Sequence, residues 1–202
     1  TLVTYSFFIL FLVLIAYFSF FIIFKSETAI NNPYNKRQDT FEKYIVRGPI
    51  YSADGKLLAE TKVAEDGKEE RSYPYANLFA HAIGYAKNGK AGVESIANFN
   101  LLRSNTFIAE RILNQVKGIQ NLGDTVYTTY SYEAQKAAFD ALGSYKGAVI
   151  AIDPSTGKIL AMVSKPDFNP NSIVKDWDSL LSLDGKDSVL INRATQGSYA
   201  PG

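Results

Sequence analysis

The longest run of hydrophobic positions is an uninterrupted apolar block at residues 2–24, LVTYSFFILFLVLIAYFSFFIIF, which contains no charged residue. An α-helix of this length is roughly 35 Å long, which is enough to cross a hydrocarbon core of roughly 30 Å. The apolar core of a cleaved signal peptide is shorter, about 7–15 residues, and ends in small residues. This block instead runs directly into Lys25-Ser26-Glu27. We therefore expect residues 2–24 to form a membrane anchor rather than a signal peptide or a buried core helix.

Polar stretches and short strand patterns follow the apolar block. Residues 25–43 are rich in Asn, Pro and charge, which is typical of a linker. Strand patterns at residues 44–51 and 57–59 flank an Asp-Gly turn, because Asp-Gly tolerates the positive φ angles that tight turns need. Residues 64–72 carry many charges, and we expect an exposed loop there.

Apolar residues then recur at helical spacing in three short segments, residues 77–86, 93–102 and 107–116. A strand pattern follows at residues 125–129. This mixture predicts a small α+β module after the linker.

The second half of the chain contains the clearest hairpin pattern. Ser131 can cap a helix whose apolar stripe extends to Leu142 and which Gly143 ends. Two apolar strands, residues 148–152 and 159–163, flank a turn at residues 153–158 that contains Pro154 and Gly157. A loop at residues 165–171 and one or two helical turns at residues 176–183 follow. We expect a second α+β unit in which a helix packs beside this hairpin.

Composition and charge exclude several functions. The net charge is +1, so nothing in the electrostatics favours nucleic acid as a partner. There is no cysteine, which excludes disulfides and thiol catalysis. His81 is the only histidine, and we expect it to be a helix or surface residue, because a zinc site or catalytic triad rarely uses one imidazole alone. Glycine-rich phosphate-binding loops are absent, and we expect no cofactor and no metal.

Serine acyl-transfer chemistry often uses Ser-x-x-Lys, since three residues on a helix bring the Lys amine within reach of the Ser hydroxyl. The pattern occurs at residues 155–158 and 172–175. Chance alone predicts roughly one match in such a chain. The first match lies on a predicted turn, and the second has no further motif around it. From the residues alone, the chain is a membrane-tethered globular chain without an identifiable active site.

Three further stretches, however, resemble motifs of the class B penicillin-binding proteins, which cross-link bacterial peptidoglycan. Residues 47–55, RGPIYSADG, resemble R-G-x-I-x-D-R-x-G. Residues 71–76, RSYPYA, are similar to R-x-Y-P-x-G, and residues 89–94, GKAGVE, fit G-x-x-G-x-E. The resemblance implies a structural role in a pedestal module for Arg47, Gly48, Arg71, Tyr73, Pro74, Gly89, Gly92 and Glu94. A buried arginine needs a carboxylate, and we expect Glu94 to be that partner.

The chain departs from the family patterns at several positions. Ser52 and Ala53 replace an Asp and an Arg, so any ion pair that those residues make is absent here. Ala76 stands where the family has Gly, and Asn169 where it usually has Asp. Tyr130-Ser131-Tyr132 lacks the acidic residue that usually precedes the first helix of the transpeptidase domain.

Residues 147–171 look like the opening hairpin of the family's transpeptidase domain, and residues 192–202, NRATQGSYAPG, resemble the run that leads to its nucleophile. In the family, Pro-Gly is followed at once by Ser-x-x-Lys. The resemblance implies that the catalytic serine comes directly after Gly202, so that residues 1–202 contain no catalytic residue.

The resemblance implies the following organisation: an α+β protein with a transmembrane anchor (2–24), a juxtamembrane linker (25–43), a pedestal module (44–122) and the incomplete start of a serine β-lactamase-like transpeptidase domain (123–202). It also implies a D,D-transpeptidase that acts on peptidoglycan stem peptides, binds β-lactams, sits in the bacterial cytoplasmic membrane by a single pass with its bulk outside, and partners a polytopic glycosyltransferase. The residues 1–202 alone are expected to be inactive. Two alternatives remain open, a non-catalytic membrane-anchored interaction module and a β-lactam-sensing receptor.

Overall fold

The computed structural model describes most of the chain and divides it into two compact units, Thr1–Lys36 and Arg37–Gly202. The described residues are 2–26, 45–64, 67–105, 113–114, 116–117, 120–183 and 187–199. Most of the predicted linker, most of the predicted helix at residues 107–116 and the Pro201-Gly202 pair lie outside the described residues.

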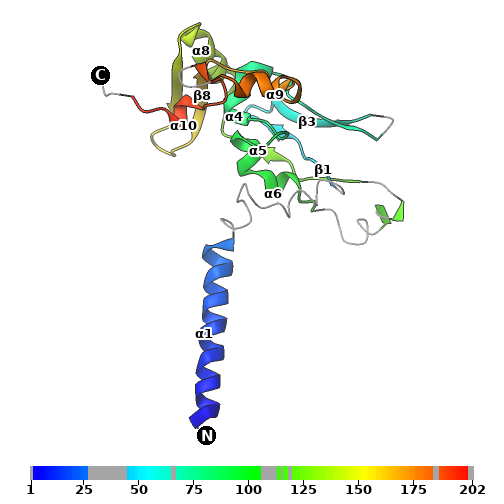
Figure 1. The fold of residues 1–202 in the computed structure, drawn as a ribbon, viewed down its shortest axis with the longest axis vertical. Helices are drawn as coiled ribbons and strands as arrows, with labels where there is room; N and C mark the ends of the chain where they lie inside the picture. The colour runs from blue at the N-terminus through cyan, green and yellow to red at the C-terminus, as the bar shows by residue number, and fades with distance from the viewer. Residues whose placement is uncertain are drawn as a thin grey trace. The chain divides into compact units, whose positions relative to one another are not determined.

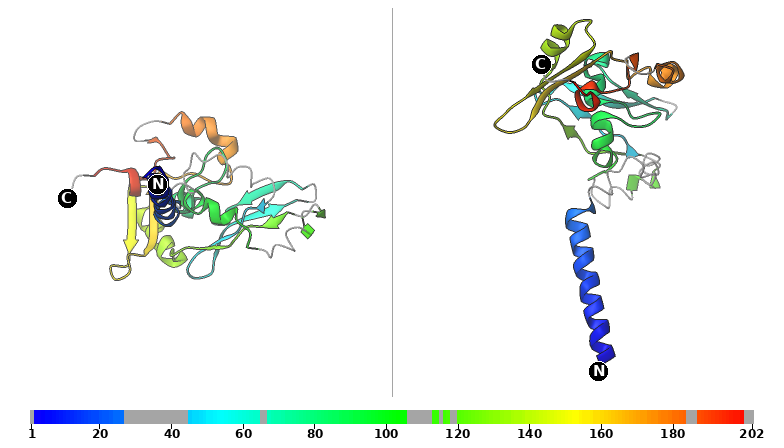
Figure 2. Two further views of the ribbon diagram at one scale, coloured as in Figure 1. Left: turned by 90° about the horizontal axis from the view of Figure 1, so that it is seen from below. Right: turned by 60° about the vertical axis from the view of Figure 1, so that its left-hand side comes forward.

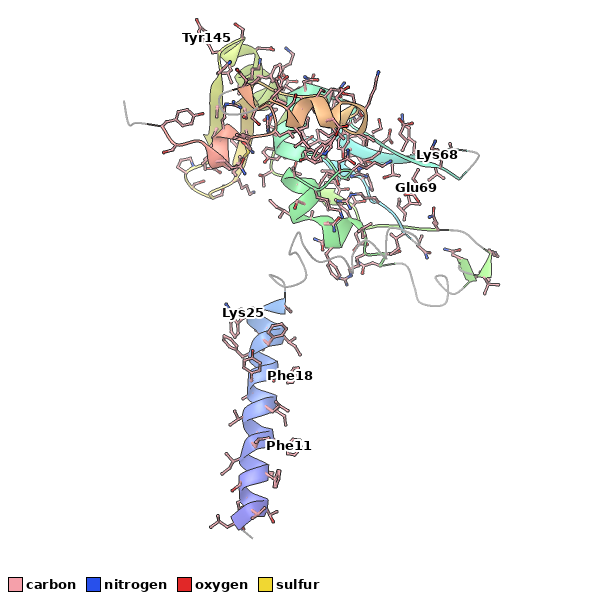
Figure 3. The ribbon with its side chains drawn as sticks, viewed as in Figure 1. Phe11, Phe18, Lys25, Lys68, Glu69 and Tyr145 are labelled. Carbon is pink, nitrogen blue, oxygen red and sulfur yellow. The ribbon has the colours of Figure 1, made fainter. Side chains whose placement is uncertain are left out.

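The first unit contains the helix α1, Leu2–Phe24, as the apolar pattern predicts. Its side chains are exposed, and those of Phe11 and Phe18 project outward from the helix (Figure 3). By length and composition α1 could cross a membrane. The hydroxyls of Ser6 and Ser26 donate to carbonyls one turn earlier, so both polar groups have partners on their own segment.

The second unit begins with a small mixed sheet, which Figure 1 shows around the label β3. Strands β2 (Ile50–Tyr51), β3 (Leu57–Val63), β4 (Glu69–Ser72) and β6 (Val126–Tyr127) lie in the order β4-β3-β2-β6. β2 pairs antiparallel with β3 and parallel with β6. A separate parallel pair joins β1 (Ile45–Val46) to β5 (Asn121–Leu122).

The prediction of a loop at residues 64–72 is wrong for the second half of that range. Residues Glu69–Ser72 form strand β4, which pairs with β3 in a hairpin. Figure 3 shows Lys68 and Glu69 on this hairpin. The loop was predicted because these residues are mostly charged. In the antiparallel register, however, Glu70 lies opposite Lys62, and the two form a cross-strand pair on a solvated face.

Four short helical segments follow β4: a 3₁₀ turn η1 (Ala76–Phe79), α4 (Ala80–Ile83), α5 (Gly92–Ile96) and α6 (Asn98–Leu101). The helix predicted for residues 77–86 is therefore shorter and starts as a 3₁₀ turn. α4 ends at Ile83 because Gly84 turns the chain with φ +81°. The helix predicted for residues 93–102 is divided into α5 and α6 at Ala97.

The hairpin and helix predicted in the second half are confirmed. α8 (Tyr132–Leu142) starts at Ser131, whose side chain accepts from the Ala134 N–H, and ends at Gly143. Strands β7 (Gly147–Ile152) and β8 (Ile159–Lys165) pair antiparallel, and Figure 1 shows α8 beside them. Among the described residues β7 and β8 form a sheet of only two strands. Helices α9 (Ile173–Leu181) and α10 (Arg193–Gln196) follow.

Two hydrophobic clusters join the early and late parts of the second unit. The larger cluster contains Ile50, Leu58 and Phe79 together with Tyr130 and Met162. The smaller cluster packs Ala80 of α4 against Phe168 and Ile173. Residues before and after the predicted boundary at 122/123 therefore share both clusters, and Arg37–Gly202 is one compact unit.

Candidate functional site

The three motif stretches meet at one buried carboxylate. Glu94 is 0% exposed in α5, and its Oε2 accepts from Arg47 Nε at 2.5 Å. Its Oε1 accepts from Arg71 Nε at 2.8 Å and from the Tyr73 hydroxyl at 3.2 Å. The predicted partnership between Glu94 and a buried arginine is confirmed, and it extends to two arginines.

Backbone and side-chain oxygens complete the shell of donors and acceptors around these arginines. Arg47 Nη2 donates to the Glu94 carbonyl at 2.6 Å and Nη1 donates to Asn98 Oδ1 at 2.5 Å. Arg71 Nη1 donates to the carbonyls of Arg47 and Gly48 and to Thr61 Oγ1. Arg71 Nη2 is buried and has no hydrogen-bond partner among the described residues. This cluster connects β3, β4 and α5 through charge-assisted hydrogen bonds.

The charge states in the cluster follow from its burial and its ion pairs. Burial favours the neutral form of Glu94, but Arg47 and Arg71 outweigh burial and hold the pKa of Glu94 below its ordinary value. Burial, and then the Glu94 carboxylate, raises the pKa of Tyr73, so its hydroxyl stays protonated and can donate. The cluster thus pairs an ionised Glu94 with two arginines and with the protonated hydroxyl of Tyr73.

Two motif glycines stand where backbones pass too closely for a side chain. A Cβ at Gly48 would lie 2.1 Å from the Asp124 carbonyl oxygen. Gly92 has φ +56°, and a Cβ there would lie 2.7 Å from the Ile83 carbonyl carbon. Gly89 lies in the turn before α5, and Pro74 is exposed beside buried Tyr73. The structural role predicted for these motif residues stays a prediction, and the contacts agree with it.

Two amide side chains connect residues 73–78 to later parts of the chain, and neither contact was predicted from the sequence. Asn171 accepts from the Tyr73 N–H at 2.8 Å and donates to the Tyr73 carbonyl at 3.0 Å. Gln135, which is 0% exposed in α8, donates to the carbonyls of Leu78 and Met162 and accepts from the Met162 N–H. No local pattern marks these residues, because their partners are backbone atoms far away in the sequence.

The serine of each Ser-x-x-Lys match donates its hydroxyl hydrogen to an acidic side chain. The Ser155 hydroxyl donates to Asp153 in the β7–β8 turn, and the Ser172 hydroxyl donates to Asp176 at the start of α9. In the described part of the chain, no hydrogen bond joins either serine to its lysine, and no group of three acidic or His side chains could hold a metal. His81 was expected to be a helix or surface residue. It lies in helix α4, but it is buried there against Phe168.

The run expected to precede the nucleophile is held against β8. Asn192 caps α10 by accepting from the Ala194 N–H at 3.0 Å, and its own N–H donates to Gln196 Oε1. Arg193 Nη1 donates to the Ser188 carbonyl at 2.9 Å. Figure 2 shows α10 in red beside the hairpin. No helix was predicted at residues 193–196, where α10 forms.

Comparisons with known proteins match both parts of this unit. Residues 47–126 match the family of the penicillin binding protein A dimerisation domain, and residues 147–202 match the penicillin binding protein transpeptidase domain. A Mycolicibacterium smegmatis peptidoglycan D,D-transpeptidase, PbpA, is 33% identical over 89% of this chain and 40% of its own length. The Escherichia coli peptidoglycan D,D-transpeptidase MrdA is 30% identical over 67% of this chain and 27% of its own length.

Solved structures show the same likeness. The imipenem acyl-enzyme complex of Mycobacterium tuberculosis penicillin-binding protein A has a TM-score of 0.66 and 32% identity, over 77% of this chain and 39% of that one. Pseudomonas aeruginosa PBP2 has a TM-score of 0.61 and 27% identity, over 76% of this chain and 37% of that one. The chain thus spans two fifths or less of the length of these relatives. Both domain matches point to the same family, and the chain belongs to the penicillin-binding protein family, with residues 47–126 in its dimerisation domain and residues 147–202 in its transpeptidase domain.

Proposed function

We propose that the full-length protein is a peptidoglycan D,D-transpeptidase that is acylated by the D-Ala-D-Ala end of a stem peptide and, in the same way, by β-lactams. The observation that carries this proposal is the match of residues 147–202 to the transpeptidase domain, with the NRATQGSYAPG run at its end. Two relatives support it: a penicillin-binding protein solved as an acyl-enzyme complex with imipenem, and a peptidoglycan D,D-transpeptidase that is 33% identical.

In the proposed reaction, a serine directly after Gly202 attacks the carbonyl carbon of the penultimate D-Ala. A lysine one helical turn later takes the hydroxyl proton, the bond to the terminal D-Ala breaks, and this D-Ala leaves as the free amine after protonation. The amine of a neighbouring stem peptide then attacks the ester, forms the cross-link and releases the serine. Residues 1–202 supply the support for this chemistry and, by themselves, are expected to be inactive.

The domain organisation follows the same proposal. Helix α1 (Leu2–Phe24) is the single-pass anchor in the bacterial cytoplasmic membrane, since its length and composition suit a membrane span. Residues 25–43 link it to a pedestal, for which the sequence predicts residues 44–122 and the family match covers residues 47–126. The transpeptidase domain, predicted to start at residue 123 and matched over residues 147–202, lies outside the cytoplasm. The anchor and pedestal would contact a polytopic glycosyltransferase that makes the glycan strands. No nucleic acid, metal or cofactor enters the reaction.

A peptide exchange assay tests the proposed activity. The full-length protein in detergent should release D-Ala from a synthetic stem peptide that ends in D-Ala-D-Ala and incorporate a labelled D-amino acid in its place. Penicillin should abolish the exchange, and so should alanine at the position after Gly202. Exchange that survives this alanine substitution would contradict the proposed mechanism. A folded full-length protein with neither exchange nor penicillin labelling would favour the non-catalytic module, and penicillin labelling without exchange would favour the β-lactam receptor.

A further inference from the structure

The buried hydroxyl of Ser164 directly connects strand β8 to residues 191–193, near the end of the matched transpeptidase region. Ser164 lies in β8, opposite Ala148 of β7, and is 2% exposed. Its Oγ accepts from the Arg193 N–H at 3.0 Å and donates to the Ile191 carbonyl at 3.3 Å. One side chain therefore satisfies two backbone groups on either side of Asn192.

Asn192 adds a second contact between residues 191–196 and β8. Its Oδ1 accepts from the Ala194 N–H, and its Nδ2 donates to Met162 Sδ at 3.4 Å, two residues before Ser164 along β8. The Asn192 carbonyl accepts from the N–H groups of Thr195 and Gln196, which closes the single turn of α10. Four residues cannot form a stable helix alone, so the contacts with β8 must hold this turn in place.

We infer that Ser164 is a positioning residue for the acylation reaction: it fixes residues 191–196 on β8 and thereby sets where the chain delivers the nucleophile. This inference rests on the proposed function. It goes beyond the resemblance, because Ser164 lies within the hairpin stretch at residues 147–171, to which the resemblance assigns no residue role. A misplacement of about 1 Å in an active site can lower a rate roughly 100-fold. Loss of the contacts between Ser164 and residues 191–193 should therefore slow acylation strongly.

The test compares Ser164→Ala with Ser52→Ala in the full-length protein. Ser52 is a matched control, since it is also a buried serine, 1% exposed, whose hydroxyl donates to Asp54 and accepts from the Lys56 N–H. Its bonds lie within its own turn and do not touch residues 191–196. We expect Ser164→Ala to lower the rate constant for acylation by a fluorescent penicillin roughly 10- to 100-fold, whereas Ser52→Ala changes it less than about twofold. Equal rates for both variants would overturn the inference.

A second pair of variants separates positioning from a general loss of stability. Asn192→Ala removes the acceptor for the Ala194 N–H and should slow acylation as Ser164→Ala does. Asn192→Asp keeps this acceptor and should restore most of the rate. Identical acylation rates for Asn192→Ala and Asn192→Asp would contradict the claim that the Asn192 cap helps to position residues 191–196.

Hydrogen exchange gives a readout that does not depend on activity. The amides of residues 193–197 should exchange faster in Ser164→Ala than in the wild type and in Ser52→Ala, while β7 and β8 keep their protection. Unchanged exchange in this segment would overturn the inference even if acylation were slowed. If the wild-type protein is not acylated at all, the proposed function fails, and the exchange experiment still decides whether Ser164 holds the segment.

Discussion

Arg47 donates its Nε hydrogen to Glu94 Oε2 over 2.5 Å, although the two residues are 47 positions apart in the sequence. The second carboxylate oxygen accepts from Arg71, and both arginine side chains are at least nine-tenths buried, with exposures of 7% and 5%. One carboxylate therefore joins the three motif stretches, and its loss would leave two arginines buried beside a neutral group.

Glu94→Gln should destabilise the protein strongly, because removing one partner of a buried ion pair leaves an uncompensated charge. The expected loss in the free energy of unfolding is about 3–5 kcal/mol, measured from urea unfolding in detergent. Glu70→Gln on the exposed face of β4 is the control and should change stability by less than about 0.5 kcal/mol. If the two variants unfold at the same urea concentration, the cluster does not stabilise the fold.

Ala76→Gly should stabilise the protein. Ala76 has φ +40°, a region that L-residues with a Cβ avoid, and it stands where the family motif has Gly. Relief of this strain exceeds the greater entropy of glycine in the unfolded chain, for a net gain of about 0.5–1 kcal/mol. Ala80→Gly in α4 is the contrasting change and should destabilise. A lower midpoint of thermal unfolding for Ala76→Gly than for the wild type would show that no strain is stored there.

Asp54, which lies in the turn between β2 and β3, should stabilise the N-terminus of α8. Its Oδ2 accepts from the Tyr132 N–H at 3.1 Å, so an acidic group stands at this helix terminus although Tyr130-Ser131-Tyr132 contains none. The Ser52 hydroxyl first, and then the Tyr132 N–H, hold the pKa of Asp54 below its ordinary value.

Asp54→Ala should therefore cost about 0.3–1 kcal/mol and speed hydrogen exchange at Tyr132. This contribution is present above the unfolded-state pKa of about 3.9 and is lost as the pH falls through the lower folded-state pKa. Asp140→Ala near the other end of α8, where Asp140 pairs with Lys136, is the control and should leave Tyr132 exchange unchanged. Equal exchange rates in Asp54→Ala and wild type would disprove the capping contact.

His81 should make stability depend on pH below neutrality. Burial lowers the pKa of His81 from its ordinary value of 6.5, despite the nearby Pro166 carbonyl and Asp167. The unfolded chain then binds a proton more readily than the folded chain, so stability is complete above about pH 6.5 and falls as the pH drops toward the folded-state pKa. Because His81 is the only histidine, NMR titration of its ring measures this pKa directly. His81→Gln should abolish the dependence that begins just below about pH 6.5; a ring pKa above 6.5 would contradict the assignment.

Local patterns predicted the elements whose stabilising contacts are local. The length of α1, the β7–β8 hairpin with its turn, and the cap and end of α8 all follow from runs of neighbouring residues. The Arg–Glu pairing followed from a general rule, that a buried guanidinium needs a carboxylate.

Tertiary contacts decided the features that the sequence analysis missed. β4 is a strand because β3 pairs with it, although its residues are mostly charged. Asn171 and Gln135 act on backbone atoms that are distant in the sequence, and α10 is a single turn held by Ser164 and Asn192. None of these contacts leaves a periodic or spacing signal in the chain.

The most direct test of the central claim is to map the site of penicillin acylation in the full-length protein by peptide mass spectrometry. Trypsin cleaves after Arg193, so the relevant peptide begins at Ala194 and includes Ser198. Fragment spectra should place the penicilloyl group on the serine directly after Gly202, and a protein of residues 1–202 should remain unlabelled. An adduct on Ser155, Ser172, Ser198 or any other residue up to Gly202 would contradict the account.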